Sequence, residues 1–359
     1  MSIEALARPE VLALSPYVSA RSSAAADGVL LNANEAPFSL AGEAHWQALD
    51  LHRYPPPQPA ALRTRLAELY GVAKQQLLVT RGSDEGIDLL VRVFCRAGQD
   101  EILETIPCFG MYRVAAGIQG AGLRQVARDD TTLAVRGPAL LEAIGDAKHL
   151  KLVFLTSPAN PTGDTVDRTL LAQVLAATED RALVVLDEAY IEFCRAESAA
   201  ELITRHPRLV VLRTLSKAWG AAGLRCGAVL ADPAVISLLG RVMAPYPLTA
   251  PAIAAALAVT GSAARETQRT MLRGVQEEKQ RLVRALTARP WVRDLWPGEA
   301  NFVLIRVDDG PALVEHCAQQ GVRVRNFHGQ PLLDNCVRLS IGDRNDMDRL
   351  NAALEAFGN

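Results

Sequence analysis

The stretch LRTLSKAWGAAGLRCG, from Leu212 to Gly227, starts as a short apolar strand and then turns into a glycine-rich loop. Lys217 follows Ser216 directly, and Arg225 comes shortly after. An unprotonated lysine amine can form a Schiff base with a carbonyl group, while a hydroxyl and a guanidinium group together suit a phosphate. The stretch therefore indicates an amine that reaches a carbonyl beside a bound phosphate. An ordinary surface lysine next to a glycine-rich turn is the alternative interpretation.

Around this stretch, from about residue 75 to 235, short apolar runs alternate with helical patterns. Most runs are almost continuously apolar, as in strands that are covered on both faces. The predicted strands are 76–80, 101–104, 152–156, 182–186, 209–213 and 226–231, and the predicted helices are 84–96, 112–117 and 167–178. This pattern predicts an α/β fold, in which helices sandwich a mainly parallel mixed sheet and functional loops lie at the carboxyl ends of its strands.

The sequence pattern changes after Pro245 and Pro247. The expected elements are helices at 250–259, 265–289 and 346–357, and strands at 301–307, 322–326 and 336–341. Because 359 residues exceed what one core usually supports, we expect two domains. Residues 30–248 would form the large domain. Residues 1–29 and 249–359 would form a smaller α+β domain, with the long helix 265–289 as the connector.

The composition excludes several classes of protein. The formal net charge of −2 provides no basic field for nucleic acid or for a membrane surface. The six cysteines are scattered, as in reduced thiols of a cytosolic protein. The six histidines lack metal-site spacing, so we expect no metal. Without a signal peptide or an apolar run long enough to span a membrane, the expected location is the cytoplasm.

Two polar loops follow predicted strands that lie before Lys217 in the chain. The segment Ser157–Gly163 contains two prolines and a glycine, which would hold the amide of Asn160 rigidly at the edge of the sheet. Asp187 emerges from an apolar strand, with Tyr190 three residues later. A buried carboxylate needs a partner, and a protonated ring nitrogen of a cofactor would serve. A structured turn and a salt bridge to an arginine are the respective alternatives.

A third loop, Thr80–Ile87, reads as a strand, a glycine turn and the start of a helix. The free backbone amides at a helix N-terminus bind phosphate with help from the helix dipole. Asp84 could instead be an ordinary N-cap residue.

Together these loops supply an amine, an acid for a ring nitrogen, groups for a ring hydroxyl and a phosphate cup, which is a complementary description of pyridoxal phosphate. At this point the chain resembles the fold-type I, class II aminotransferases, and within them the branch that acts on L-histidinol phosphate. The resemblance extends from residue 15 to about 345. Its segments are Ser15–Arg21, Leu31–Glu35, Arg53–Pro55, Gly82–Ile87, Asp187–Phe193, Ala244–Leu248 and Val337–Ser340.

The resemblance implies a role for each residue around the cofactor. Lys217 would bond to the cofactor and later move a proton, and Asp187 would keep the pyridinium nitrogen protonated. Asn160 and Tyr190 would bind the phenolic oxygen of the ring. The cofactor phosphate would be bound by Ser216, Arg225, the backbone amides of Ser83 and Asp84, and Tyr54 of a neighbouring subunit.

The resemblance also implies substrate contacts and one departure. Arg325 and Arg338 would bind the anionic end of the substrate, because the arginine fork matches a carboxylate or phosphate. Tyr17 would close over it. A surface ion pair remains the alternative for either arginine. Phe109 stands where the family usually has Tyr, so stacking on the cofactor ring is kept and a hydroxyl bond is lost.

The reaction implied by the resemblance transfers the amino group of L-histidinol phosphate to 2-oxoglutarate, in histidine biosynthesis. Shared active sites imply a homodimer. Two related activities remain open, namely an aromatic amino-acid aminotransferase and a phosphothreonine decarboxylase of the same fold. A cofactor-binding regulatory module is disfavoured because the sequence has no basic DNA-binding segment.

Overall fold

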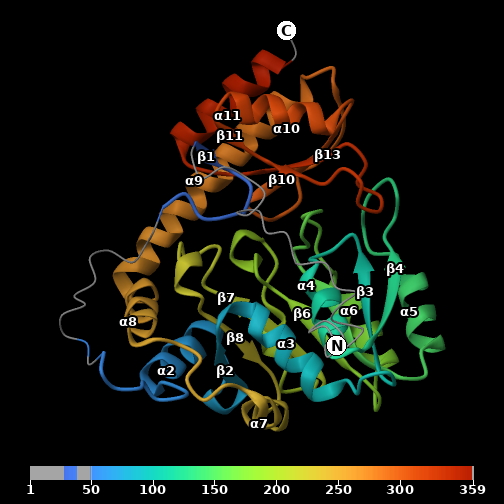
Figure 1. The fold of residues 1–359 in the computed structure, drawn as a ribbon, viewed down its shortest axis with the longest axis vertical. Coiled ribbons are helices and arrows are strands. Elements are labelled where there is room, and N and C mark those ends of the chain that lie inside the picture. The colour runs from blue at the N-terminus through green and yellow to red at the C-terminus, as the bar shows by residue number, and fades with distance from the viewer. Residues whose placement is uncertain (1–27, 39–48, 50, 358–359) are drawn as a thin grey trace, which may run out of the picture.

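The computed structural model describes residues 28–38, 49 and 51–357. Its large sheet has seven strands in the order β2-β8-β7-β6-β5-β3-β4 (Figure 1). All neighbours are parallel except where β8 pairs with β2 and β7. The strands are β2 (Leu77–Thr80), β3 (Glu101–Ile106), β4 (Gly122–Ala127), β5 (Leu150–Thr156), β6 (Leu183–Asp187), β7 (Leu209–Thr214) and β8 (Gly227–Leu230). The predicted mainly parallel mixed sheet is confirmed.

Helices cover both faces of this sheet because side chains along each strand alternate between two apolar layers. Val153 and Val184 point to the layer under one group of helices, and Phe154 and Val185 point to the other. The first group is α2 (Ala60–Tyr70), α5 (Gly137–Asp146), α6 (Arg168–Ala177) and α8 (Ala250–Val259). The second is α3 (Gly82–Phe94), α4 (Met111–Gln119) and α7 (Pro233–Val242). The expected sandwich is thus confirmed.

The C-terminal part forms a separate apolar core at the end of the long helix α9 (Ser262–Thr287), above the large sheet in Figure 1. A four-stranded antiparallel sheet has the order β12-β13-β10-β9, and β1 pairs in parallel with β11. These elements are β1 (Val29–Leu30), β9 (Val292–Trp296), β10 (Phe302–Val307), α10 (Gly310–Gln319), β11 (Val322–Arg323), β12 (Arg325–Asn326), β13 (Cys336–Ser340) and α11 (Arg344–Phe357). The separate core supports the predicted domain division, which stays a prediction.

Several elements differ from the sequence-based expectations. The predicted strand 322–326 is wrong as one strand, because the chain changes partners at Val324 and pairs with β1 before it and β13 after it. Strand β4 was missed because it lies at the sheet edge with most side chains exposed, so its sequence is not apolar. Short 3₁₀ helices at Lys74–Gln76, Ile191–Phe193, Ala199–Leu202 and Ala222–Leu224 were also not expected.

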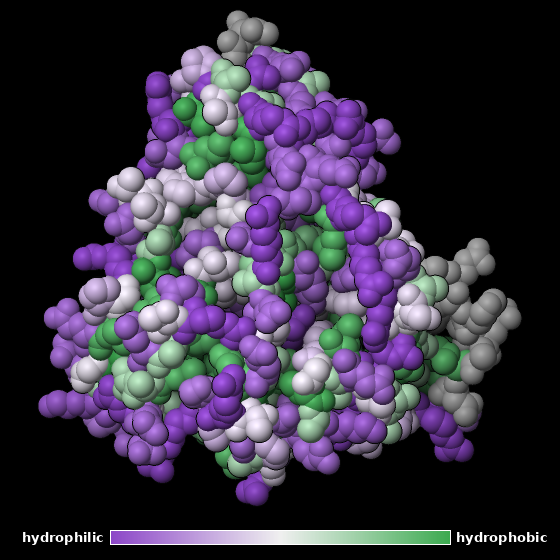
Figure 2. Space-filling model, turned by 180° about the vertical axis from the view of Figure 1, so that it is seen from behind, coloured by the Kyte–Doolittle hydropathy of each residue, from purple (hydrophilic) through white to green (hydrophobic). Residues whose placement is uncertain are grey.

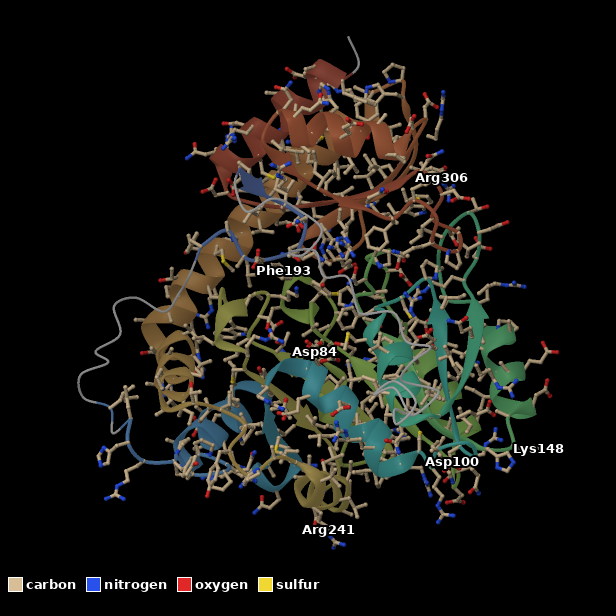
Figure 3. All side chains as sticks on the ribbon, in the orientation of Figure 1. Asp84, Asp100, Lys148, Phe193, Arg241 and Arg306 are labelled. Atoms are coloured by element: carbon tan, nitrogen blue, oxygen red, sulfur yellow. The ribbon has the colours of Figure 1, made fainter. Side chains whose placement is uncertain are left out.

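Contacts between the two parts involve the segment after β6. Phe193 is half-buried between the cores of the large and the small part (Figure 3). In the view from behind, hydrophilic residues spread over the whole visible face, interrupted by smaller hydrophobic patches (Figure 2). Among the described residues, no helix has the length and apolar character needed to cross a membrane.

The strand ends meet at the edge of the large sheet that faces the small part. Thr80 and Thr214 both pair with Gly227, and Thr156 pairs with Asp187, so the loops that follow these strands emerge side by side. Gly227 is required at this edge because a Cβ atom there would lie 2.7 Å from the carbonyl carbon of Gly82 and 2.9 Å from the nitrogen of Ser83. The glycine thus lets β8 approach the start of α3.

Replacing Gly227 by alanine should lower the free energy of unfolding by about 1–3 kcal/mol, because the nearest atoms are backbone atoms that cannot move aside. Urea unfolding measures this loss. Gly240→Ala is the matched control, since Gly240 lies inside α7 with nothing within 4 Å of the added atom. The control should keep or raise stability. Equal stability of the two variants would contradict the close approach.

Candidate active site

A cavity of about 720 Å³ opens at this edge of the large sheet. Its wall combines loops after the strands with residues of the small part and of the segment after β1. It brings together eleven residues predicted from the sequence: Ser83, Asp84, Phe109, Asn160, Asp187, Tyr190, Ser216, Lys217, Arg225, Arg325 and Arg338. A volume of this size suits a small-molecule ligand.

Lys217 lies in the loop after β7 with its amine in the cavity wall. Nζ donates a 2.9 Å hydrogen bond to the carbonyl oxygen of Ala33 and lies 5.6 Å from the centre of the Tyr190 ring. Only this one hydrogen bond of the amine is seen among the described residues. The surface-lysine alternative is therefore wrong, because Lys217 points inward.

Asp187 ends β6 with a side chain that is only 2% exposed. Its carboxylate accepts hydrogen bonds from the Tyr112 hydroxyl at 2.8 Å and the Ala189 amide at 3.1 Å. Burial raises the pKa of Asp187 to about 6, against the lowering effect of these two bonds. Among the described residues no cation lies within ion-pair distance of this carboxylate. The arginine salt bridge considered from the sequence is absent there.

The arginine of this region pairs with other acids. Arg213, on β7, forms ion pairs with Glu188 at 3.6 Å and with Glu192 at 2.7 Å. Asp187 and Glu188 are neighbours in the chain and point in opposite directions. Glu188 therefore meets the cation, while Asp187 faces the cavity.

The start of α3 and the loop after β7 together form a cup of hydrogen-bond donors in the cavity wall. The amides of Ser83 and Asp84 lie in the first turn of α3, where backbone N–H groups have no acceptor within the helix. The hydroxyl of Ser216 accepts hydrogen bonds from Thr214 at 2.9 Å and from Arg225 at 3.5 Å. Each of these groups lines the same cavity.

Asp84 is not the N-cap of α3, since that position is Arg81. Its carboxylate forms an ion pair with Arg225 at 3.0 Å. Asp84 lies at the end of α3 that faces the small part (Figure 3). The acid thus holds the Arg225 guanidinium beside the start of α3.

The small part contributes two further arginines, Arg325 and Arg338, to the cavity wall. Arg338, on β13, is 4% exposed, and its guanidinium donates to the side-chain oxygen of Asn160 and to the carbonyl oxygen of Asn32 at 3.0 Å. Its carbon lies 5.4 Å from the ring centre of Phe327, and that of Arg325 lies 5.9 Å from the same ring. A buried guanidinium in a cavity favours an anionic ligand. Arg338 therefore lies inside the cavity and not on the surface.

The three predicted aromatic residues Phe109, Tyr54 and Tyr17 differ in how they relate to the cavity. Phe109 lines the cavity and meets Tyr112 edge to face at 5.8 Å. Tyr54 is 80% exposed, stacks on Tyr246 at 4.5 Å and is not among the residues of the cavity wall. Tyr17 lies outside the described residues. The cavity of one chain thus includes Phe109 but not Tyr54.

Sequence reasoning missed several polar residues of the site. Tyr112 is fully buried, bonded to both Asp187 and Thr156, and had been considered only as part of a helix. The signal that could have found it is the need of a buried carboxylate for a donor. Asn34 lies in a segment that supported the family resemblance but had no assigned role, and it bonds to Tyr190.

Comparison with known proteins establishes the class. Residues 26–354 match the family described as Aminotransferase class I and II, so the chain belongs to that family and is a pyridoxal-phosphate-dependent aminotransferase. The histidinol-phosphate aminotransferase of Aeromonas salmonicida is 42% identical over 361 residues, covering 99% of this chain and 98% of the relative. That of Stenotrophomonas maltophilia is 42% identical over 355 residues, covering 98% and 96%.

A solved structure shows the same fold with the cofactor. The histidinol-phosphate aminotransferase from Sinorhizobium meliloti, in complex with pyridoxal-5'-phosphate, has a TM-score of 0.85 and 25% identity, covering 97% of this chain and 96% of that one. Within the aminotransferases, this chain belongs with the histidinol-phosphate aminotransferases. The family resemblance, the fold and the cofactor predicted from the sequence are thereby confirmed.

The residues of the cavity fit this cofactor. The decisive feature is the buried Asp187 carboxylate, which has no cationic partner among the described residues and suits a protonated pyridine nitrogen. Lys217 is an amine within the same cavity, and the start of α3 provides amides for a phosphate. A neutral or apolar ligand would leave Asp187 uncompensated.

The cofactor-free protein should be stabilised by Asp187→Asn at high pH. The folded-state pKa of about 6 exceeds the usual 3.8, so the wild type loses stability as pH rises from about 4 to about 6. The asparagine variant avoids this loss, which amounts to up to about 3 kcal/mol. Its amide can donate to Tyr112, whose proton then turns to Thr156.

Urea unfolding of the cofactor-free forms at pH 4 and pH 8 measures this effect. The variant should match the wild type at pH 4 and exceed it at pH 8. A difference that is the same at both pH values would show that the carboxylate carries no burial penalty.

Proposed function

We propose that the chain transfers the amino group between L-histidinol phosphate and 2-oxoglutarate, giving imidazole-acetol phosphate and L-glutamate, in L-histidine biosynthesis. The observation that supports it most is that the buried Arg338 guanidinium and the Lys217 amine line the same cavity. A substrate that carries both an amine and an anionic group could therefore reach Lys217 and Arg338 within this cavity. The 42% identity to histidinol-phosphate aminotransferases favours this substrate.

Four residues are proposed to act on the cofactor and the reacting amine. Bound pyridoxal phosphate supplies an electron-withdrawing ring that makes the carbon next to the amine acidic. Lys217 would bind the cofactor and then carry the proton to and from that carbon. Asp187, as an anion, would hold the ring nitrogen protonated. Asn160 and Tyr190 would bind the phenolic oxygen, with Phe109 stacked on the ring.

Other residues would bind the two anionic groups. Ser216, Arg225 and the amides of Ser83 and Asp84 would hold the cofactor phosphate. Arg338 and Arg325 would bind the substrate phosphate in one half-reaction and a carboxylate of 2-oxoglutarate in the other. Tyr17 would close over this end of the site.

A homodimer with shared sites is also part of the proposal. Tyr54 would reach the cofactor phosphate of the neighbouring subunit. Its exposure on the single chain and its absence from the cavity of that chain support a role across an interface.

The free state of all six cysteines supports a cytoplasmic location.

Steady-state rates should show a preference for the phosphorylated substrate. With 2-oxoglutarate as acceptor, kcat/KM for L-histidinol phosphate should exceed that for L-histidinol by roughly 100-fold, because the dephosphorylated amine leaves charged donors unpaired. L-Phenylalanine serves as the test of the aromatic alternative, and faster turnover of phenylalanine would refute the assignment. Release of CO₂ from O-phosphothreonine would indicate the decarboxylase instead.

Shared sites predict complementation between two inactive variants. Lys217→Ala and Tyr54→Ala subunits, each with little activity alone, should regain about a quarter of wild-type activity when mixed at random, since one site of each mixed dimer is intact. Activity of the mixture is the measurement, and the purified mixed dimer should show about half of wild-type activity. A mixture as inactive as its components would show that Tyr54 acts within its own subunit or not at all.

A further inference from the structure

Residues 32–34 form a strap along the cavity, and each backbone carbonyl of the strap accepts a hydrogen bond from a side chain. The donors are Arg338 to Asn32 at 3.0 Å, Lys217 to Ala33 at 2.9 Å, and the side chain of Asn301 to Asn34 at 3.1 Å. Asn34 has a φ of 56°, a left-handed conformation that asparagine tolerates better than most residues. Three side chains therefore hold the strap in place. Asn34 itself is buried, with 1% of its surface exposed.

The hydrogen bonds of Asn34 have a defined direction. Its backbone N–H donates to the Ser340 hydroxyl at 3.1 Å, and that hydroxyl lies 2.6 Å from the side-chain oxygen of Asn34. A distance of 2.6 Å suits O–H···O, whereas N–H···O bonds are longer. The amide oxygen thus faces Ser340. The amide nitrogen then donates to the Tyr190 hydroxyl at 3.1 Å.

This direction determines what Tyr190 can do. Its oxygen accepts a bond from Asn34, so its own proton is left for another acceptor. Its ring is fixed by an edge-to-face contact with Phe302 at 5.4 Å, and the residue is 4% exposed. Both Tyr190 and Asn34 line the cavity. The hydroxyl proton of Tyr190 is therefore available for donation to a group bound in the cavity.

We propose that Asn34 is a positioning residue, which makes Tyr190 a hydrogen-bond donor to the phenolic oxygen of bound pyridoxal phosphate. The inference rests on the proposed contact between Tyr190 and that oxygen. A donated bond stabilises the negative charge of the phenolic oxygen. It thereby favours loss of the proton that the oxygen shares with the nitrogen of the Lys217 linkage. Ser340 acts one step further away, by holding the Asn34 amide in this orientation.

Asn34→Asp tests the proposal with minimal change of shape. Aspartate also tolerates the left-handed backbone and can accept the Ser340 bond, but it cannot donate to Tyr190. The Tyr190 proton would turn to the carboxylate, and the cofactor would lose its donor. The readout is the pH midpoint of the visible absorption change of the resting holoenzyme, without substrate. We expect this midpoint to rise.

The new charge by itself would also raise the midpoint, so the same substitution is made in a Tyr190→Phe background. Phenylalanine has no hydroxyl, and the shift there measures the effect of charge alone. The shift in the Tyr190 background should be larger by about one pH unit or more. Equal shifts in the two backgrounds, including none, would overturn the proposal.

Asn34→Gly provides a second test without charge, since glycine adopts the same backbone conformation freely. It should give a smaller rise when Tyr190 is present and no change in the Tyr190→Phe background; a rise in both would again contradict the proposal. Because no substrate is present, failure to turn over histidinol phosphate leaves this test intact. If the resting wild-type holoenzyme showed no absorption band that depends on Lys217, the cofactor assignment itself would be refuted.

Discussion

The buried carboxylate of Asp187 is the constraint on which the site depends. An anion that is 2% exposed, with only two hydrogen bonds from the described residues, raises the free energy of the ligand-free protein unless it is protonated. A cation in the cavity removes that penalty. The next residue, Glu188, has a cation in Arg213. The unpaired buried charge is therefore confined to Asp187, which faces the cavity, where a protonated ring would compensate it.

The topology of the sheet brings the partners of this acid together. Parallel strands place their carboxyl ends at one edge, so loops that are distant in the chain meet there. The reversed strand β8 adds its first residue, Gly227, to the same edge and allows the start of α3 to lie against it. The small part closes the site through β13, which carries Arg338 and Ser340. One strand thus contributes both a buried cation of the cavity wall and the hydroxyl that bonds to Asn34.

Much of this arrangement could be predicted from the sequence, because buried parallel strands leave apolar runs and their loops carry polar residues at fixed places. Lys217, Asp187 and Asn160 were found in this way and line one cavity. Strand β4 was missed because its exposed edge position leaves no apolar run. The break at Val324 was missed because partner exchange between two strands leaves no local signal.

By itself, the sequence determined the fold class and the chemical groups at each strand end, because these depend on local periodicity and on which residue follows an apolar run. Only the tertiary structure decided how the groups pair. In the tertiary structure Arg213 forms an ion pair with Glu188 and not with Asp187, and Asp84 forms one with Arg225. Asn34 forms hydrogen bonds with Tyr190 and Ser340, which lie 156 and 306 residues away along the chain. Such pairings depend on distances between segments remote in sequence, and on which way each buried side chain can satisfy its hydrogen bonds.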